Sequence, residues 1–296
     1  MKYLGMMVLL AFTACNTQGN TTELAEVNGS YKAISEIPFT ETYSRIKSSL
    51  LEAAPITIVA EVDHKSNANG IDQELNEAKT IFFGNPALGT PFMQENQQAG
   101  LDLPQKIAVY TTSTDKAVVI YNSVDYLMAR HGVNPATAPM VATALNKIAS
   151  NATQSEPIQN KATVARDEGV ITVNSNQSFE NTYSSLITLL SSNPAITIVA
   201  ELDHQKNAMS VGLNLRPTRV VIFGNPALGT PLLQETGTVS LDLPQKMLLY
   251  QDAAGNVILA YNDAAYIAKR HGIPQDDRMA SINAALSNIA SKAAGK

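Results

Sequence analysis

The sequence predicts an α+β protein that consists of two tandem copies of one domain. The first observation is a long internal repeat, because ITIVAEVDH at 56–64 returns as ITIVAELDH at 196–204. The second is the order of patterns within a copy, where short β-branched runs alternate with stretches of helical periodicity. We expect each copy to be a β-α-β-β-β-β-α domain with a mainly antiparallel sheet. The copies should pack as a pseudo-dimer, because duplicated domains often keep a two-fold interface.

The repeat keeps a constant offset of 140 residues. FGNPALGTP, LDLPQK and RHG begin at Phe83, Leu101 and Arg130 and return at Phe223, Leu241 and Arg270. About 39 of the 91 positions from Thr42 to Gly132 are identical in the second copy, without a gap. The pattern predicts a first domain at 30–150, a polar linker at 151–168 and a second domain at 169–296.

The expected elements follow from local patterns. Strands are predicted at 31–35, 56–62, 80–83, 106–111, 117–121 and 169–173, and helices at 40–53, 124–131, 137–150 and 178–191. Ser178 should cap its helix, and a short helix should run over 90–95 with Pro91 at its first position. Strand alternation places Thr57, Val59, Glu61 and Asp63 on one face and Ile56, Ile58, Ala60 and Val62 on the core face.

The first residues have the pattern of a secretion signal, with Lys2, an apolar run at 4–12 and small residues before Cys15. The apolar run is shorter than the roughly 20 residues that span a bilayer. Phe12-Thr13-Ala14-Cys15 resembles the bacterial lipobox, which predicts a signal peptide at 1–14, a lipid on Cys15 and a polar tether over 15–29. We therefore expect a lipoprotein of the bacterial cell envelope, in the outer membrane facing the periplasm. An unlipidated product is the alternative.

Composition excludes several classes of function. The net charge of -5 and the absence of any Lys or Arg run argue against nucleic-acid binding. Cys15 is the single cysteine, so the mature chain has no internal disulfide, no cysteine-rich metal site and no second thiol as nucleophile. The GNPALGT segment has the glycine spacing of a phosphate loop but lacks its lysine.

The four histidines occupy matched positions beside matched carboxylates. The candidate site residues at the two strand ends are Glu61, Asp63 and His64, and Glu201, Asp203 and His204. With His131 or His271 supplied by another element, they would suit a cationic ligand or a metal. The spacing fits no established metal pattern, so a metal is weakly supported and no cofactor is predicted. The alternative is a polar strand face on which Asp63 caps the helical turn at 64–70.

Arg130-His131-Gly132 and its repeat at Arg270-His271 allow two interpretations. Basic residues in a last helical turn complement the helix dipole, and the glycine then takes the left-handed position that ends the helix. The functional interpretation is that the arginine and histidine bind an anionic group such as a carboxylate. Asn122, in the repeated Tyr-Asn pair, is expected to cap the following helix.

Together these motifs resemble the domain-of-unknown-function family 302, over about 100 residues of each copy. The second copy is the closer match, since VGLNLRPTRVVIFGNP contains Arg216, which the first copy lacks. The resemblance implies a fold similar to the TATA-binding-protein-like arrangement, usually found as dimers, and implies no established activity. Function belongs to the site rather than to the fold, so no DNA binding follows.

The sequence favours a lipid-anchored envelope protein whose paired domains bind a small ligand or a protein, and it leans against an enzyme. One alternative is a hydrolase or isomerase that uses His131 with Asp63. Another is a purely structural pseudo-dimer. The expected partners are a membrane, through Cys15, and the other copy of the domain.

Overall fold

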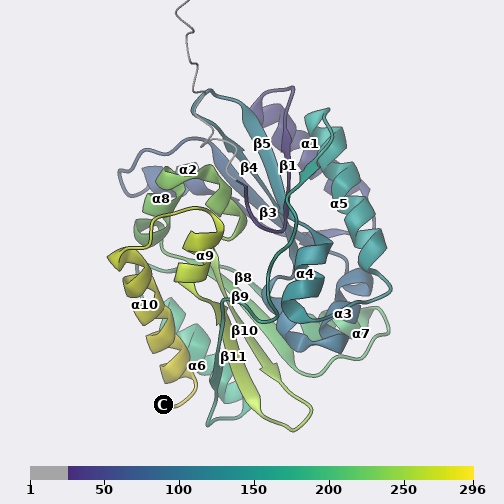
Figure 1. The fold of residues 1–296 in the computed structure, drawn as a ribbon. Helices are drawn as coiled ribbons and strands as arrows, with labels where there is room; N and C mark the ends of the chain where they lie inside the picture. The colour runs from purple at the N-terminus through teal and green to yellow at the C-terminus, as the bar shows by residue number, and fades with distance from the viewer. Residues whose placement is uncertain (1–25) are drawn as a thin grey trace, which may run out of the picture.

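The computed structural model describes residues 26–296, which form two similar α+β domains with antiparallel sheets (Figure 1). The predicted signal at 1–14, Cys15 and the first part of the tether at 15–29 lie outside the described residues. Among the helices of 26–296, none combines the length and the apolar character that crossing a membrane requires.

The first copy contains the five predicted strands. Its elements are β1 Ser30–Ile34, α1 Phe39–Glu52, β2 Thr57–Asp63, α2 His64–Asn69, β3 Ala78–Gly84, α3 Pro86–Glu95, the 3-10 helix η2 Gln97–Leu101, β4 Gln105–Thr111, β5 Ala117–Asn122, α4 Val124–His131 and α5 Ala138–Thr153. The predicted order of strands and main helices is confirmed, with α2, α3 and η2 inserted between strands.

The second copy repeats this order. Its elements are β7 Val170–Asn174, α6 Phe179–Ser191, β8 Thr197–Asp203, α7 His204–Ser210, β9 Thr218–Gly224, α8 Pro226–Glu235, the 3-10 helix η3 Gly237–Leu241, β10 Gln245–Gln251, β11 Val257–Asn262, α9 Ala264–Arg270 and α10 Asp277–Ala293. Between the copies, the two-residue strand β6 Ile158–Gln159 pairs with β1. The sheet orders are β2-β3-β4-β5-β1-β6 and, for the second copy, β7-β11-β10-β9-β8.

Each sheet is covered on its outer face by helices of its own copy. Figure 1 shows α1 and α5 on one side of the molecule and α6 and α10 on the opposite side. Apolar side chains of these helices, such as Ile46 and Leu145 in the first copy and Leu186 and Leu286 in the second, form the two main cores. Burial of these side chains is the dominant stabilising contribution to each domain.

The inner face of each sheet packs against the other copy. The 3-10 helix η3 lies on β3, β4 and β5, while η2 lies on β9, β10 and β11. Side chains from both copies, among them Phe82, Leu101, Ile222 and Leu248, form a shared apolar cluster. The inner faces are therefore buried, and β4 is buried along its whole length. The copies pack as a pseudo-dimer.

The alternation predicted for β2 is wrong, because a β-bulge shifts the register between Ile58 and Ala60. A bulge adds one residue to one strand and changes which face later side chains occupy. Ile56 and Ile58 pack into the first copy's own core, whereas Val62 belongs to the cluster shared with the second copy. The same bulge occurs in β8.

Helix termini follow the predicted capping chemistry with two exceptions. The Ser178 hydroxyl accepts a hydrogen bond from the Asn181 N–H, as predicted. Pro91 lies inside α3 rather than at its start, because Asn85 caps the helix and Pro86 takes the first position. Asn122 does not cap α4; the Ser123 hydroxyl accepts the hydrogen bond from the Tyr126 N–H instead.

Candidate functional site

Two matched cavities lie between the copies. The first cavity, of about 320 Å³, has a wall from α3, β4 and α5 of the first copy and a mouth formed by the end of β8 and the start of α7 in the second. The second cavity, of about 460 Å³, has the reverse construction, with a wall from α8, β10 and α10 and a mouth at β2 and α2. The FGNPALGTP segment of each copy thus faces the strand end Glu-x-Asp-His of the other.

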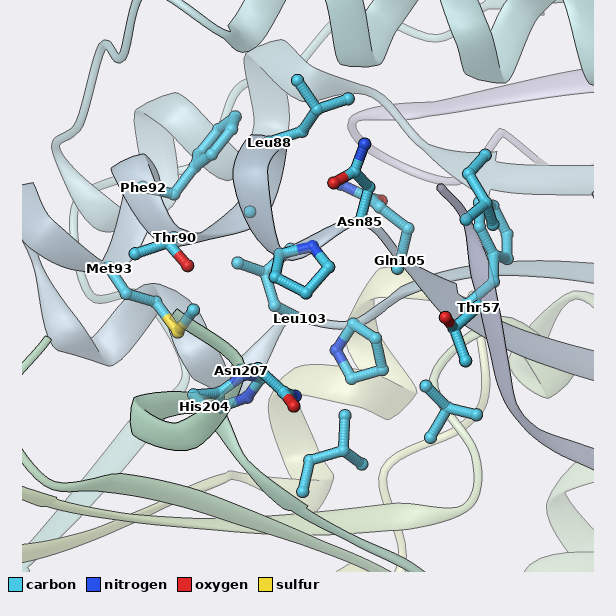
Figure 2. A pocket seen from close by; sticks show the side chains of 18 of the residues that line it. Thr57, Asn85, Leu88, Thr90, Phe92, Met93, Leu103, Gln105, His204 and Asn207 are labelled. Carbon is cyan, nitrogen blue, oxygen red and sulfur yellow. The ribbon is translucent and has the colours of Figure 1, made fainter. Parts of the chain in front are cut away.

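The cavity walls are mainly apolar. In the first cavity, Phe92, Met93 and Leu103 lie around the space, and Thr57, Asn85 and Gln105 add polar groups (Figure 2). Leu145 of α5 also lines this cavity. His204 and Asn207 reach the same space from α7 (Figure 2). No lysine or arginine lines either cavity within residues 26–296. Apolar walls with a few polar groups are typical of small-molecule sites.

The mouth of the second cavity holds two carboxylates of the first copy, each with a lysine partner. Glu61 accepts a hydrogen bond from the Tyr43 hydroxyl at 2.8 Å and pairs with Lys47 at 2.8 Å. Asp63 pairs with Lys79 at 2.9 Å and caps α2 by accepting the Ser66 N–H. Burial alone would raise the pKa of both carboxyls, but these partners lower the pKa below its usual value.

The mouth of the first cavity has a different set of partners. Asp203 accepts hydrogen bonds from the Lys206 N–H and from Arg219 Nε at 3.1 Å. Glu201 accepts a hydrogen bond from the Tyr183 hydroxyl. Within the described part of the chain, no cationic side chain lies within 4.0 Å of Glu201.

His64 and His204 are buried beside these carboxylates, and each is 5% exposed. Burial lowers the pKa of both imidazoles to about 4, so both are neutral near pH 7. His64 Nε2 lies 3.1 Å from the Thr80 hydroxyl, which donates to the Ser240 carbonyl. His204 Nε2 has no hydrogen-bond partner among residues 26–296, because Val220 occupies the position that matches Thr80.

His131 and Arg130 lie elsewhere, in a buried network between the copies. His131 Nε2 and Arg130 Nη1 both donate to Asp102 Oδ2 at 2.8 Å. Gly132 adopts the predicted left-handed conformation that ends α4, with φ of 61°. The carboxylate that this arginine and histidine bind therefore belongs to the protein itself. Burial alone would raise the pKa of Asp102, but Arg130, His131 and Lys246 hold it well below its usual value.

The second copy repeats this network at Asp242. Arg270 Nη1 donates to Asp242 Oδ2 at 2.6 Å, and His271 Nε2 donates to the same oxygen at 2.9 Å. Lys106 of the first copy donates to Asp242 Oδ1 at 2.9 Å, whereas Lys246 Nζ lies 3.9 Å from Asp102 Oδ1. Burial, together with the neighbouring Lys106, lowers the pKa of Lys246 to about 7.

The structure thus separates the candidate residues into two groups. Glu61, Asp63 and His64 line the second cavity, and Glu201, Asp203 and His204 line the first. Arg130 and Arg270 contribute instead to the interface, because they donate hydrogen bonds to Asn262 and Asn122 of the other copy. His131 and His271 bind the same carboxylates as these arginines. Arg216 also bridges the copies, because its Nε donates to Gln97 Oε1 at 2.9 Å. No group of three or more possible metal ligands occurs in the described residues.

Sequence reasoning missed the interface partners Asp102, Lys106, Asp242, Lys246 and Asn262. The sequence did mark these residues, because they belong to the segments LDLPQK and YN, which occur in both copies. What was missing is the pairing between copies, which an offset of 140 residues does not specify.

Comparisons with known proteins place these motifs in a family. The chain is 35% identical over 131 residues to the fluoride-specific ion channels FluC 1 of Brucella suis and Brucella abortus and FluC 2 of Brucella melitensis. The match covers 44% of this chain and 48–51% of those proteins, so the chain spans about half the length of the curated relatives it matches. A crystal structure of an uncharacterized conserved protein from Bacillus stearothermophilus aligns with a TM-score of 0.36 and 17% identity, over 43% of this chain and 97% of that one.

The family model described as "Domain of unknown function DUF302" matches residues 31–152 and again 171–292. These two matches span most of the chain, one in each copy. The protein is therefore a tandem member of the DUF302 family.

Proposed function

We propose that this protein is a lipid-anchored binding protein of the bacterial cell envelope, and that it holds small apolar molecules in the two cavities between its copies. The observation that supports binding is the pair of matched cavities, each built from both copies. Their volumes lie near the lower end of the roughly 300–1,000 Å³ that is usual for small-molecule sites. Apolar walls favour ligands that bury apolar surface.

The anchor would be a lipid on Cys15, with 15–29 as the tether and the outer membrane, on its periplasmic side, as the location. The support is the lipobox-like Phe12-Thr13-Ala14-Cys15 after an apolar run. We expect the wild-type protein to incorporate a palmitate label and to fractionate with membranes, and Cys15→Ser to lose both properties. Label incorporation by the serine variant would contradict this assignment.

Binding is tested with residues 16–296, which include every described element. N-phenyl-1-naphthylamine, a neutral apolar dye that fluoresces in apolar surroundings, should bind with saturation. Ala144 lines the first cavity and Ala285 the second, so Ala144→Phe and Ala285→Phe should each remove part of the signal and the double variant nearly all of it. Ala253→Phe, on the exposed turn between β10 and β11, is the matched control.

An unchanged titration in the double variant, with thermal unfolding like that of the control, would contradict binding in these cavities. The enzyme alternative required His131 and Asp63 in one place. Asp63 lines the second cavity, whereas His131 is fully buried against Asp102. These placements favour binding over that catalytic pairing.

A further inference from the structure

The two cavity mouths differ in charge although their strand ends match. At the second cavity, Glu61 and Asp63 are paired with Lys47 and Lys79. Two carboxylates and two ammonium groups leave this mouth without excess charge.

The first cavity lacks this balance. Ile187 replaces Lys47 at the matching position of α6, so within residues 26–296 the Glu201 carboxylate has Tyr183 as its partner and no lysine. Glu180 replaces Thr40, and both of its oxygens accept hydrogen bonds from Arg219, which also serves Asp203.

Three carboxylates therefore lie at this mouth, and Arg219 donates hydrogen bonds to two of them, Asp203 and Glu180. Within residues 26–296, the one further cation paired at this mouth is Lys206, whose side chain is 78% exposed and whose Nζ lies 3.9 Å from Asp203 Oδ2. With this lysine counted, three carboxylates face two cationic side chains, Arg219 and Lys206. The first cavity thus has an excess of negative charge at its mouth.

The interior of the first cavity adds no compensating positive charge. Its described lining contains no lysine or arginine, and His204 is neutral because burial lowers its pKa to about 4. An anionic head group would lose its hydration without meeting a cation. A protonated amine would meet a carboxylate instead.

We propose that the first cavity binds an apolar molecule that ends in a protonated amine. The apolar part lies among Phe92, Leu103 and Leu145, and the ammonium group lies beside Glu201 at the mouth. The second cavity, whose mouth is neutral, has no such preference. This inference rests on the proposed binding function and specifies its ligand class.

The test compares decylamine, decanol and decanoate as competitors of the dye, at pH 7. Residues 16–296 carrying Ala285→Phe report on the first cavity alone, and Ala144→Phe reports on the second. In the first cavity, decylamine should bind about two- to fivefold more tightly than decanol, the range expected for a solvent-accessible charge pair, and decanoate should bind most weakly. In the second cavity, the amine and the alcohol should bind alike.

Two substitutions test whether the negative charge at the mouth of the first cavity causes its preference for amines. Glu201→Gln and Ile187→Lys should each reduce the affinity of the first cavity for decylamine to that for decanol. Their controls are Glu52→Gln and Leu51→Lys, which make the same charge changes at exposed positions of α1 that line neither cavity. The reciprocal change, Lys47→Ile, should create an amine preference in the second cavity.

The possible outcomes separate the two proposals. If the dye does not bind with saturation, or if the double variant Ala144→Phe/Ala285→Phe binds it like the wild type, the binding function itself fails. If the dye binds in the cavities but decylamine does not displace it from the first, the ligand class is wrong. If all three bind but decanoate binds best in the first cavity, or if Glu201→Gln leaves the amine preference intact, the ligand class is wrong while the binding function stands.

Discussion

Arg130 of the first copy donates a hydrogen bond from Nη2 to Oδ1 of Asn262 in the second copy, at 2.8 Å. The reciprocal bond joins Arg270 Nη2 to Asn122 Oδ1 at 2.7 Å. Both arginines are almost fully buried, so each bond forms where water does not compete. Buried ion pairs often contribute little net stability compared with apolar residues of the same size. The two hydrogen bonds do, however, join the copies at matched positions, because each arginine reaches the asparagine of the other copy.

The first prediction concerns Asp102→Asn. This substitution leaves Arg130 and the nearby Lys246 buried without the carboxylate that they face. Removal of one partner of a buried pair is expected to lower the free energy of unfolding by about 3–5 kcal/mol. Urea unfolding followed by circular dichroism measures the change. Glu41→Gln, which breaks the exposed pair with Arg45, should cost less than about 1 kcal/mol, and an equal loss in both variants would contradict the argument.

The sequence alone was sufficient for the fold class and for most elements, because periodicity and β-branching are local signals. The helix predicted at 124–131 matches α4, and the Ser178 cap is present. The prediction of which β2 side chains share a face was wrong, because the alternation of apolar and polar residues gives no sign of the bulge near Ile58. The predicted start of α3 was wrong because two prolines, Pro86 and Pro91, are both suited to the first helical position, and the helix begins at Pro86.

The candidate site was only partly predictable, because both cavities and the buried network depend on contacts between copies. Asp63 and His64 were identified from their repetition, and they line a cavity. The cavity wall opposite them belongs to the other copy, which no spacing within one copy indicates. His131 was placed with Asp63, whereas it binds Asp102, a residue of the same copy that follows η2.

The second prediction uses a natural difference between the copies. Thr80 supplies a hydroxyl to His64, whereas the matching Val220 leaves His204 Nε2 without a partner within the described residues. Thr80→Val should lower the free energy of unfolding by about 1–2 kcal/mol, because it removes a buried hydrogen-bond partner. Val220→Thr should recover about 1 kcal/mol by placing a hydroxyl beside His204. Equilibrium unfolding of both variants tests the pair, and destabilisation by Val220→Thr would oppose the expected hydrogen bond.

The third prediction is a loss of stability in mild acid. Burial lowers the pKa of His64 and His204 to about 4, from an ordinary value of 6.5. Between these two values the unfolded chain binds more protons than the folded chain, so stability falls as the pH decreases from about 6.5 to about 4. Each histidine should account for up to about 3 kcal/mol of this loss.

The measurement is the free energy of unfolding in urea at several pH values from 7 to about 4. His204→Leu should flatten the dependence in this window. Asp102 and Asp242 affect stability only below this pH window, because their pKa values in the folded protein lie well below 3.8. Their protonation at lower pH removes their stabilising contribution. A slope that is unchanged in His204→Leu would show that other groups cause the acid sensitivity.

The last prediction concerns two tyrosines that meet between the copies. The hydroxyl oxygens of Tyr126 and Tyr266 are 2.9 Å apart, and the Arg270 guanidinium lies 4.0 Å from the centre of the Tyr126 ring. Tyr126→Phe and Tyr266→Phe should each cost about 1 kcal/mol, and the double variant should cost less than the sum, because both single changes remove the same hydrogen bond. Tyr126→Phe combined with Tyr183→Phe should be additive, since Tyr183 bonds instead to Glu201. Additivity in the Tyr126 and Tyr266 pair as well would mean that this hydrogen bond does not couple the copies.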